Sequence, residues 1–226
     1  KQDFKKEDVM AVGGVPLAGD SLDGSIMRRK VVKHFGGDVQ YQVPFGDNVL
    51  KMPLALMSHL CSTAHIQLLN SRENRDFLSR VKSWSLGDED QHRMEQLEIL
   101  LDQQLGFAVF ESIERAKRGL SESSESKIHY EYPGIRIDET FTRSEFETVS
   151  KQEVDKIFAA LDATLLRAGV LPSQVSKVCL TGGTAKATVI RSELESRFGK
   201  EKLEEFRNFT SIAEGLAEYA FEAYSS

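Results

Sequence analysis

The chain has 226 residues, and its 29 basic and 35 acidic side chains give a formal charge of −6. An apolar fraction of 40% with only 5 prolines excludes disordered, collagen-like and low-complexity classes. The length suffices to bury a hydrophobic core in one large domain or two lobes. A negative charge without a dense basic block argues against nucleic acid or an anionic membrane as the main partner.

The composition also limits the compartment and the metal chemistry. The longest nearly apolar stretch, residues 49–69, is interrupted by charged, proline and histidine residues, so it predicts no membrane span. Cys61 and Cys179 lie far apart, which favours a reducing, cytoplasmic compartment and indicates no disulfide framework. His59 and His65 flank Cys61, but packing is commoner than metal binding in such an apolar run. We therefore expect a soluble protein without a bound metal.

The first part of the chain carries short, glycine-separated runs. Residues 8–17 hold two apolar segments on either side of Gly13 and Gly14, a pattern that predicts a β-hairpin. A small turn is expected at residues 19–24, and a helix should follow until Phe35. The start of the chain lacks an initiator methionine and a signal segment, so we expect a piece of a longer protein.

The middle of the chain changes its hydrophobic period once. From residue 47 to about 119 the apolar spacing is helical almost throughout, with polar interruptions near residues 71–74 and 85–90. Residues 127–140 alternate apolar and polar side chains around Pro133-Gly134, which predicts a second β-hairpin. These patterns indicate a helical subdomain followed by a hairpin.

Three pairs have the spacing of a capping box, in which a hydroxyl and a carboxylate satisfy free amides at a helix start. They are Thr142 with Glu145, Ser150 with Glu153, and Ser211 with Glu214. The second pair is expected to open a helix that ends at Gly169. Residues 177–181 then predict a buried strand, which two glycines and an amphipathic helix follow. The chain as a whole reads as mixed α/β.

The strand, double glycine and helix at residues 178–194 form the first candidate site. Glycines remove Cβ atoms, so that a ligand can approach the backbone, and a helix start favours a phosphate. Tight strand-to-helix turns also need glycine for purely steric reasons, and spacing alone favours that explanation.

The second candidate is a polar stripe on a predicted helix. Glu114, Lys117, Arg118 and Ser121 stand at i, i+3, i+4 and i+7. A carboxylate can accept from sugar hydroxyls, and a guanidinium can stack on an aromatic ring. Basic residues in a last helical turn are, however, commonly dipole complements on a solvated face. No serine-hydrolase, zinc-protease or Walker motif is present, so we assign no catalytic residue.

Separated segments together resemble the ATPase domain of the heat-shock 70-kilodalton chaperone family, in the actin and sugar-kinase superfamily. Residues 114–121, Glu-Arg-Ala-Lys-Arg-Gly-Leu-Ser, resemble its adenosine-binding helix, residues 180–186 its second adenosine motif and residues 211–220 its closing helix. Residues 17–23 are similar to its Leu-Gly-Gly-x-Asp-Phe-Asp turn, and residues 141–147 to its Thr-Arg-x-x-Phe-Glu helix start. Their order and spacing agree over nearly the whole chain.

The resemblance implies an α/β fold: an actin-like ATPase (ribonuclease H-like) lobe with a helix-rich inserted subdomain and a β-hairpin. Residues 1–23 and 127–226 would form the core lobe, and residues 24–126 the mainly helical subdomain. The chain would be the second half of such a domain. Because no β-rich peptide-binding domain follows, it resembles the short YegD-type branch.

The resemblance also implies roles for the first set of site residues. Glu114 and Lys117 would hold the ribose hydroxyls of ATP or ADP. Arg118 would stack on the adenine, and Ser121 would reach a ring nitrogen. Gly19 matches a glycine near the phosphates.

The second set follows the predicted strand. Gly182 and Gly183 would line the ribose and phosphate, and Thr184 belongs to the same cofactor motif. Lys186 stands where the family usually has an arginine on the other adenine face, and an ammonium stacks less well. Ala213 replaces a usual aspartate, so we expect either weaker clamping of the base or an altered nucleotide preference.

The function implied is that of a second-lobe fragment of a chaperone ATPase, which supplies the adenosine side of an ATP/ADP cleft. Mg²⁺ would accompany the nucleotide in the full-length parent, and a client protein would be a partner. The two aspartate-glycine phosphate loops have no counterpart here, so this piece alone is not expected to hydrolyse ATP. The alternative is a nucleotide-free actin-like interaction scaffold, which the changes at Lys186 and Ala213 motivate.

Overall fold

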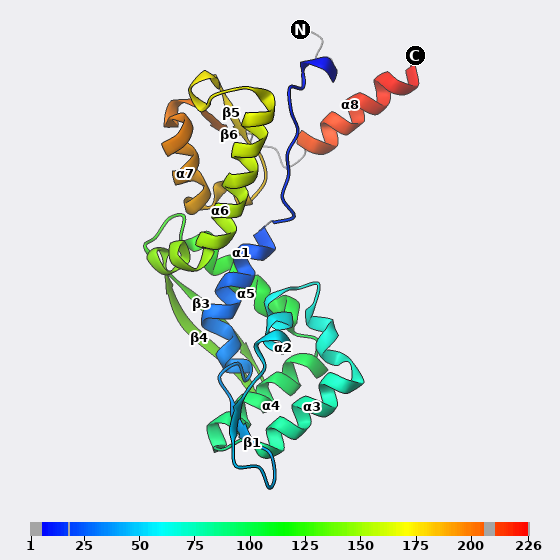
Figure 1. The fold of residues 1–226 in the computed structure, drawn as a ribbon, viewed down its shortest axis with the longest axis vertical. Helices are drawn as coiled ribbons and strands as arrows, with labels where there is room; N and C mark the ends of the chain where they lie inside the picture. Colours follow the sequence, from blue (N-terminus) through cyan, green and yellow to red (C-terminus); the bar gives the residue numbers. More distant parts are fainter. Residues whose placement is uncertain (1–5, 18, 206–210, 226) are drawn as a thin grey trace. The chain divides into compact units, whose positions relative to one another are not determined.

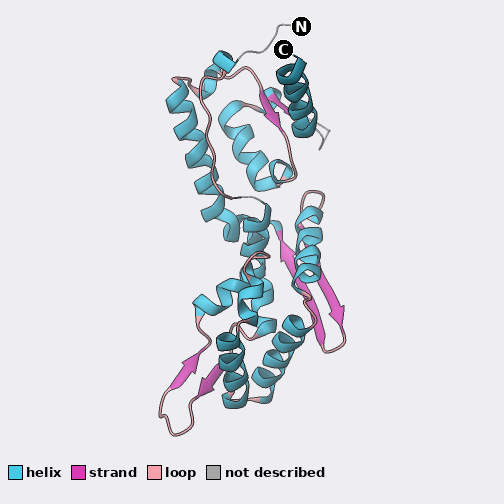
Figure 2. Cartoon of the chain, turned by 90° about the vertical axis from the view of Figure 1, so that its right-hand side faces the viewer, coloured by secondary structure: helices cyan, strands magenta, loops and turns pink. Residues whose placement is uncertain are grey.

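The computed structural model describes residues 6–17, 19–205 and 211–225. The chain mixes helices with small two-stranded sheets (Figures 1 and 2). It divides into two compact units, the smaller formed by Lys1–Pro16 with Val154–Ser226 and the larger by Leu17–Glu153. Within the described ranges, every helix is too short or too polar to cross a bilayer.

The larger unit begins with helix α1 (Gly19–Ile26), which continues through a π-helical segment (Met27–Val31) and a 3₁₀ segment (Val32–Phe35). The helix predicted to end at Phe35 is confirmed, and Gly36 ends it with φ 81°. The turn predicted at residues 19–24 is wrong, because these residues form the first turns of α1. Leu22 and Ile26, one helical turn apart, are both buried, and that burial favours a helix over a turn.

The helical region predicted between residues 47 and 119 is confirmed from Leu54 onward, but its start is wrong, because Val49–Lys51 form a short strand. It contains α2 (Leu54–Ser58), 3₁₀ segments at His59–Cys61 and Ile66–Asn70, α3 (Arg72–Trp84), α4 (Asp88–Asp102) and α5 (Gly106–Gly119). The polar interruptions are helix boundaries, and the Ser71 hydroxyl caps α3 by accepting from the Asn74 amide at 3.3 Å.

A short hairpin precedes these helices and was missed from the sequence. Strand β1 (Gln40–Gln42) pairs antiparallel with β2 (Val49–Lys51). Its strands have three residues each, and Pro44 and Gly46 lie between them. Such a short run offers little alternation to detect.

The second hairpin is confirmed. Strands β3 (Glu125–Tyr132) and β4 (Ile135–Thr142) pair antiparallel around Gly134, which has φ 85°. The Thr142–Glu145 capping box is confirmed too: the Thr142 amide donates to Glu145 Oε2 at 2.9 Å, and the Glu145 amide donates to Thr142 Oγ1 at 3.2 Å. These bonds open helix α6 (Arg143–Ala168).

The capping box predicted at Ser150 and Glu153 is wrong, because α6 runs unbroken past both residues. The Ser150 hydroxyl donates to the Phe146 carbonyl at 2.6 Å, one turn back in the same helix. A serine inside a helix can satisfy its hydroxyl in this way and then caps nothing. The predicted end is confirmed, since Gly169 has φ 67°.

The smaller unit has a two-stranded parallel sheet of β5 (Val178–Leu180) and β6 (Leu203–Glu205), with helices α7 (Thr188–Phe198) and α8 (Ser211–Ser225). Its core consists of Phe158, Leu180, Ile190, Leu194 and Phe198. The predicted strand at residues 177–181 is confirmed, but of its residues only Leu180 is buried. The side chains of Ser211 and Glu214 lie outside the described residues, so that capping box stays a prediction.

The hairpin predicted at residues 8–17 is wrong. A 3₁₀ turn covers Lys6–Asp8, and residues 9–17 form no strand. Instead, Arg167 Nη2 on α6 donates to the Val12 carbonyl at 2.9 Å. A Cβ on Gly13 would collide with Thr164 of the same helix. The segment therefore lies along α6, and the glycine allows this close approach rather than a tight turn.

Candidate functional site

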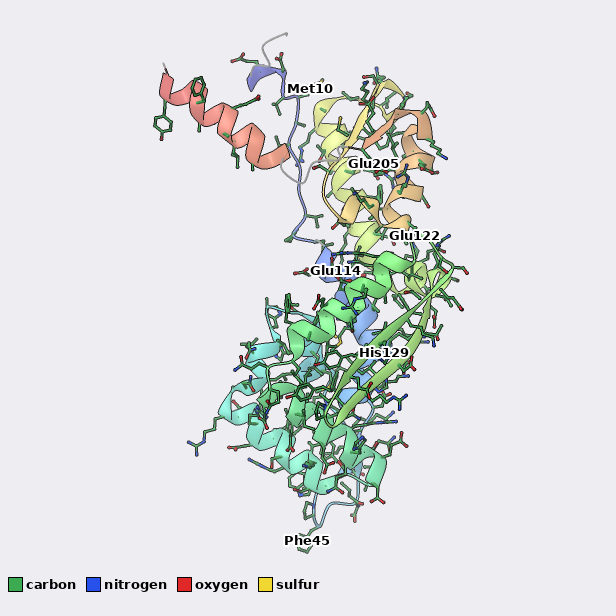
Figure 3. All side chains as sticks on the ribbon, turned by 180° about the vertical axis from the view of Figure 1, so that it is seen from behind. Met10, Phe45, Glu114, Glu122, His129 and Glu205 are labelled. Carbon is green, nitrogen blue, oxygen red and sulfur yellow. The ribbon has the colours of Figure 1, made fainter. Side chains whose placement is uncertain are left out.

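Helix α5 carries the first group of candidate residues because one of its sides is firmly packed. Val109, Ile113 and Ala116 are at most 1% exposed. The opposite side presents Glu114 and Arg118, one turn apart, with Arg118 Nη2 2.5 Å from Glu114 Oε1 (Figure 3 labels Glu114). The Arg118 side chain is 73% exposed, and the neighbouring carboxylate raises its pKa further. A rigid helix thus presents a planar cation to solvent.

Lys117 lies on α5 between these two residues but points to a different partner. Its Nζ lies 2.7 Å from Asp23 Oδ1 and 2.9 Å from Asp23 Oδ2, and the two side chains are only 14% and 9% exposed. Burial raises the pKa of the Asp23 carboxyl, although the Lys117 cation opposes that shift. The pair joins α1 to α5. Sequence reasoning missed it, because the two residues are 94 positions apart.

Ser121 does not continue the stripe. Helix α5 ends at Gly119, and the Ser121 amide donates to the Arg118 carbonyl at 3.0 Å in the turn that follows. Its exposed hydroxyl is therefore positioned by a turn and not by helical spacing. Gly19, the glycine expected near the phosphates, is the first residue of α1, four positions before Asp23.

The second group lies between β5 and α7, where Gly182, Gly183 and a 3₁₀ segment, Thr184–Lys186, connect the strand to the helix. Gly182 has φ 83°, a left-handed conformation that favours glycine. Gly183 has φ −67°, which any residue adopts. A Cβ on either glycine would meet no atom within 4 Å. The fold therefore needs glycine at 182 and has no such need at 183.

The sequence-predicted residues thus fall into two sets, one in each unit. The larger unit holds Gly19, Glu114, Lys117, Arg118 and Ser121, and the smaller unit holds Gly182, Gly183, Thr184 and Lys186. Within the larger unit the structure brings Lys117 to Asp23 and Arg118 to Glu114.

The histidine and cysteine residues between α2 and α3 have packing contacts. Cys61 is buried, and its thiol donates to the Met57 carbonyl at 3.7 Å. The rings of His59 and His65 meet edge to face, with centroids 6.3 Å apart. Across the part of the chain that the structure describes, no three His, Cys, Asp or Glu side chains are grouped as metal ligands.

Comparison with known proteins shows to which protein family the chain belongs. A profile of the Hsp70 protein family matches residues 75–220. The match covers more than half of the chain and contains every residue predicted for the nucleotide site except Gly19. The chain belongs to the Hsp70 family.

Curated relatives agree with this assignment. The chaperone protein DnaK of Deinococcus proteolyticus is 24% identical over 150 residues, which cover 63% of this chain and 24% of that protein. A chaperone protein HscA homolog of Shewanella sp. (strain MR-7) is 28% identical over 118 residues, 52% of this chain and 19% of the homolog. The chloroplastic stromal 70 kDa heat shock-related protein of Pisum sativum is 26% identical over 132 residues, 56% of this chain and 18% of its own. The chain spans at most about a quarter of the length of these relatives.

Proposed function

We propose that this chain is a nucleotide-binding part of an Hsp70-type chaperone, an actin-like ATPase lobe that contacts the adenosine of ATP or ADP. Glu114 and Lys117 bind the ribose hydroxyls, and Arg118 stacks on the adenine. Ser121 reaches a ring nitrogen. The second motif, Gly182, Gly183, Thr184 and Lys186, lines the nucleoside and its phosphates, with Gly19 near the phosphates.

The observation that carries this proposal is the environment of Gly183. Two explanations were open for the double glycine: a steric need of the turn or the approach of a ligand. The conformation of Gly182 accounts for the first glycine. At Gly183, neither the backbone angle nor the surrounding atoms require a glycine. Free space above an exposed backbone lets a sugar or a phosphate approach Gly183 closely.

The residues of α5 fit the chemistry of a nucleoside. Glu114 holds one edge of the Arg118 guanidinium, which leaves its flat face available for an aromatic ring. Lys117 has three N–H donors and donates one of them to Asp23 Oδ2 at 2.9 Å, while Asp23 Oδ1 is its ion-pair partner at 2.7 Å. A remaining donor can donate to a ribose hydroxyl. These residues bind and orient the nucleoside, and none of them is assigned a role in phosphoryl transfer.

The other properties of the whole protein follow from the family and stay predictions. They are Mg²⁺ bound with the nucleotide, an unfolded client protein as partner, a cytoplasmic location and membership of the short YegD-type branch. The predicted core lobe of residues 1–23 and 127–226, with a helical subdomain at 24–126, belongs to the same set.

Arg118→Ala should weaken ADP binding by about tenfold or more in the full protein that carries this sequence, because it removes the stacking cation. Isothermal titration measures the effect. Arg72→Ala is the matched control. Arg72 is also an exposed helical arginine, and its acidic partner, Asp76, lies one helical turn away. If wild type and Arg118→Ala bind ADP with equal affinity, Arg118 does not contact the adenine. A wild-type protein with no ADP affinity would instead favour the nucleotide-free scaffold.

The two glycines give a paired test. Gly183→Ala should leave the free energy of unfolding unchanged and weaken ADP binding, because the new methyl group fills the space where a ligand approaches. Gly182→Ala should destabilise the fold by about 1 kcal/mol through its left-handed backbone. Urea unfolding without nucleotide and ADP titration separate the effects. A Gly183→Ala protein that is destabilised yet binds ADP normally would contradict the proposal.

A further inference from the structure

The β1–β2 hairpin of the larger unit has one covered edge and one open edge. On the covered side, Tyr41 of β1 forms an antiparallel bridge to Ser85, and the Leu86 amide donates to the Gln40 carbonyl at 3.3 Å. On the other side lies β2, and β1 is its only partner among the strands that the structure describes. The hairpin and its loop project from the neighbouring helices (Figure 2). An open edge strand is a template for pairing with another chain.

The register shows which backbone groups face the open edge. The Met52 amide donates to the Val39 carbonyl at 3.0 Å, and the ladder pairs Tyr41 with Leu50. Because an antiparallel ladder alternates between bonded and non-bonded pairs, Val49 and Lys51 direct their N–H and C=O groups outward. Asp47 lies two residues before β2, and a strand extended by those two residues would give it the same direction.

The side chains along this edge are unusually apolar for a solvated hairpin. Val49 is 51% exposed and Leu50 is 40% exposed. Phe45, at the tip of the loop, is fully exposed with φ 66°, an uncommon conformation for a bulky residue (Figure 3). Exposed apolar side chains beside unpaired backbone groups indicate a surface that another chain covers.

The charges identify that other chain. Asp47 and Lys51 are both exposed and lie two positions on either side of Val49. Within the described residues neither of them forms an ion pair. If two β2 strands pair antiparallel about a two-fold axis at Val49, Lys51 of each copy lies directly opposite Asp47 of the other. Opposite charges at such positions stabilise a cross-strand pair, and like charges destabilise it.

We propose that two copies of this chain associate through their β2 strands, forming a four-stranded antiparallel sheet with Val49 on the symmetry axis. The edge is self-complementary in backbone hydrogen bonding, in apolar character and in charge, as a two-fold interface requires. Nucleotide binding plays no part in this inference.

Two charge variants test the register. In Asp47→Lys, lysines face each other at positions 47 and 51, and in Lys51→Asp, aspartates do so. Each variant alone should dimerise at least about tenfold more weakly than wild type, whereas an equimolar mixture should regain dimers, because each lysine then faces an aspartate. Sedimentation velocity over rising protein concentration measures the association of the 226-residue chain.

A third variant tests the backbone contacts. Val49→Pro removes an amide donor that points away from β1, so it should abolish dimers while far-UV circular dichroism and thermal unfolding keep their wild-type values. A wild-type protein that stays monomeric at every concentration would overturn the proposal. So would dimers that persist in both charge variants, or a mixture that associates no better than its components.

Discussion

Lys117→Met should destabilise the larger unit by about 2–4 kcal/mol at neutral pH, because it leaves the Asp23 carboxylate buried without its cation. Asp23 is 9% exposed and Lys117 14% exposed, so we place the loss slightly below that of a fully enclosed pair. Methionine keeps most of the apolar stem of lysine, and packing should therefore change little. Urea unfolding followed by the fluorescence of Trp84, the only tryptophan, measures the larger unit directly.

The loss of stability in Lys117→Met should depend on pH, and it should be larger at neutral pH than in acid. Burial already raises the pKa of Asp23 in the wild-type protein, and removing the Lys117 cation raises it further. A carboxyl group whose folded-state pKa exceeds its unfolded value, about 3.9, contributes its full stability below that value. The contribution is lost as pH rises through the folded-state pKa. The difference in free energy of unfolding between wild type and Lys117→Met should therefore be small in acid and grow towards neutral pH.

Two further variants distinguish the loss of the Lys117 charge from the loss of its packing contacts. Adding Asp23→Asn to Lys117→Met replaces the buried carboxylate by a neutral amide, so it should recover most of the lost stability and flatten the pH dependence. Arg118→Met is the matched control on the same helix, and it should leave the free energy of unfolding unchanged because Arg118 is largely exposed. A Lys117→Met loss that is equal at acid and neutral pH would show that the pair acts through packing alone.

Features with a local cause were predictable from the sequence. The β3–β4 hairpin follows from an alternation that Pro133-Gly134 interrupts, and the start of α6 follows from the Thr142–Glu145 pair. The packed side of α5 follows from the spacing of Val109, Ile113 and Ala116. In each case the signal and the contact lie within a few residues of each other, so a pattern in the chain is also a pattern in space.

Features set by distant partners were not predictable. Ser150 has the same spacing to an acidic residue as Thr142 has, but the surrounding helix is continuous, and its hydroxyl bonds backward. The Asp23–Lys117 contact depends on how α1 and α5 pack. The sequence likewise could not separate Gly182 from Gly183, because the difference is a backbone angle. The sequence therefore predicted part of the polar stripe on α5, but it did not predict that Lys117 pairs with Asp23.

Gly24→Ala should lower the stability of the larger unit by about 2–3 kcal/mol, although alanine is the better helix former. Gly24 follows Asp23 in α1, and a Cβ there would lie well inside 3.0 Å of the backbone carbonyl oxygen of Cys61. The obstacle is backbone, so no side-chain rotation relieves it. The segment that carries it is held in the core by Leu60, which is fully buried. Either α1 or this segment has to shift.

The matched control is Gly87→Ala in the same unit, where a Cβ would meet no atom within 4 Å and the backbone is extended at φ −152°. Gly87→Ala should lower the free energy of unfolding by less than about 1 kcal/mol, because alanine is less favoured than glycine at the N-cap of α4. Trp84 fluorescence in urea serves both variants. If Gly24→Ala unfolds at the same urea concentration as Gly87→Ala, then α1 is not clamped against the His59–Cys61 segment. In that case the position of Asp23 beside Lys117 must be fixed by α5 alone.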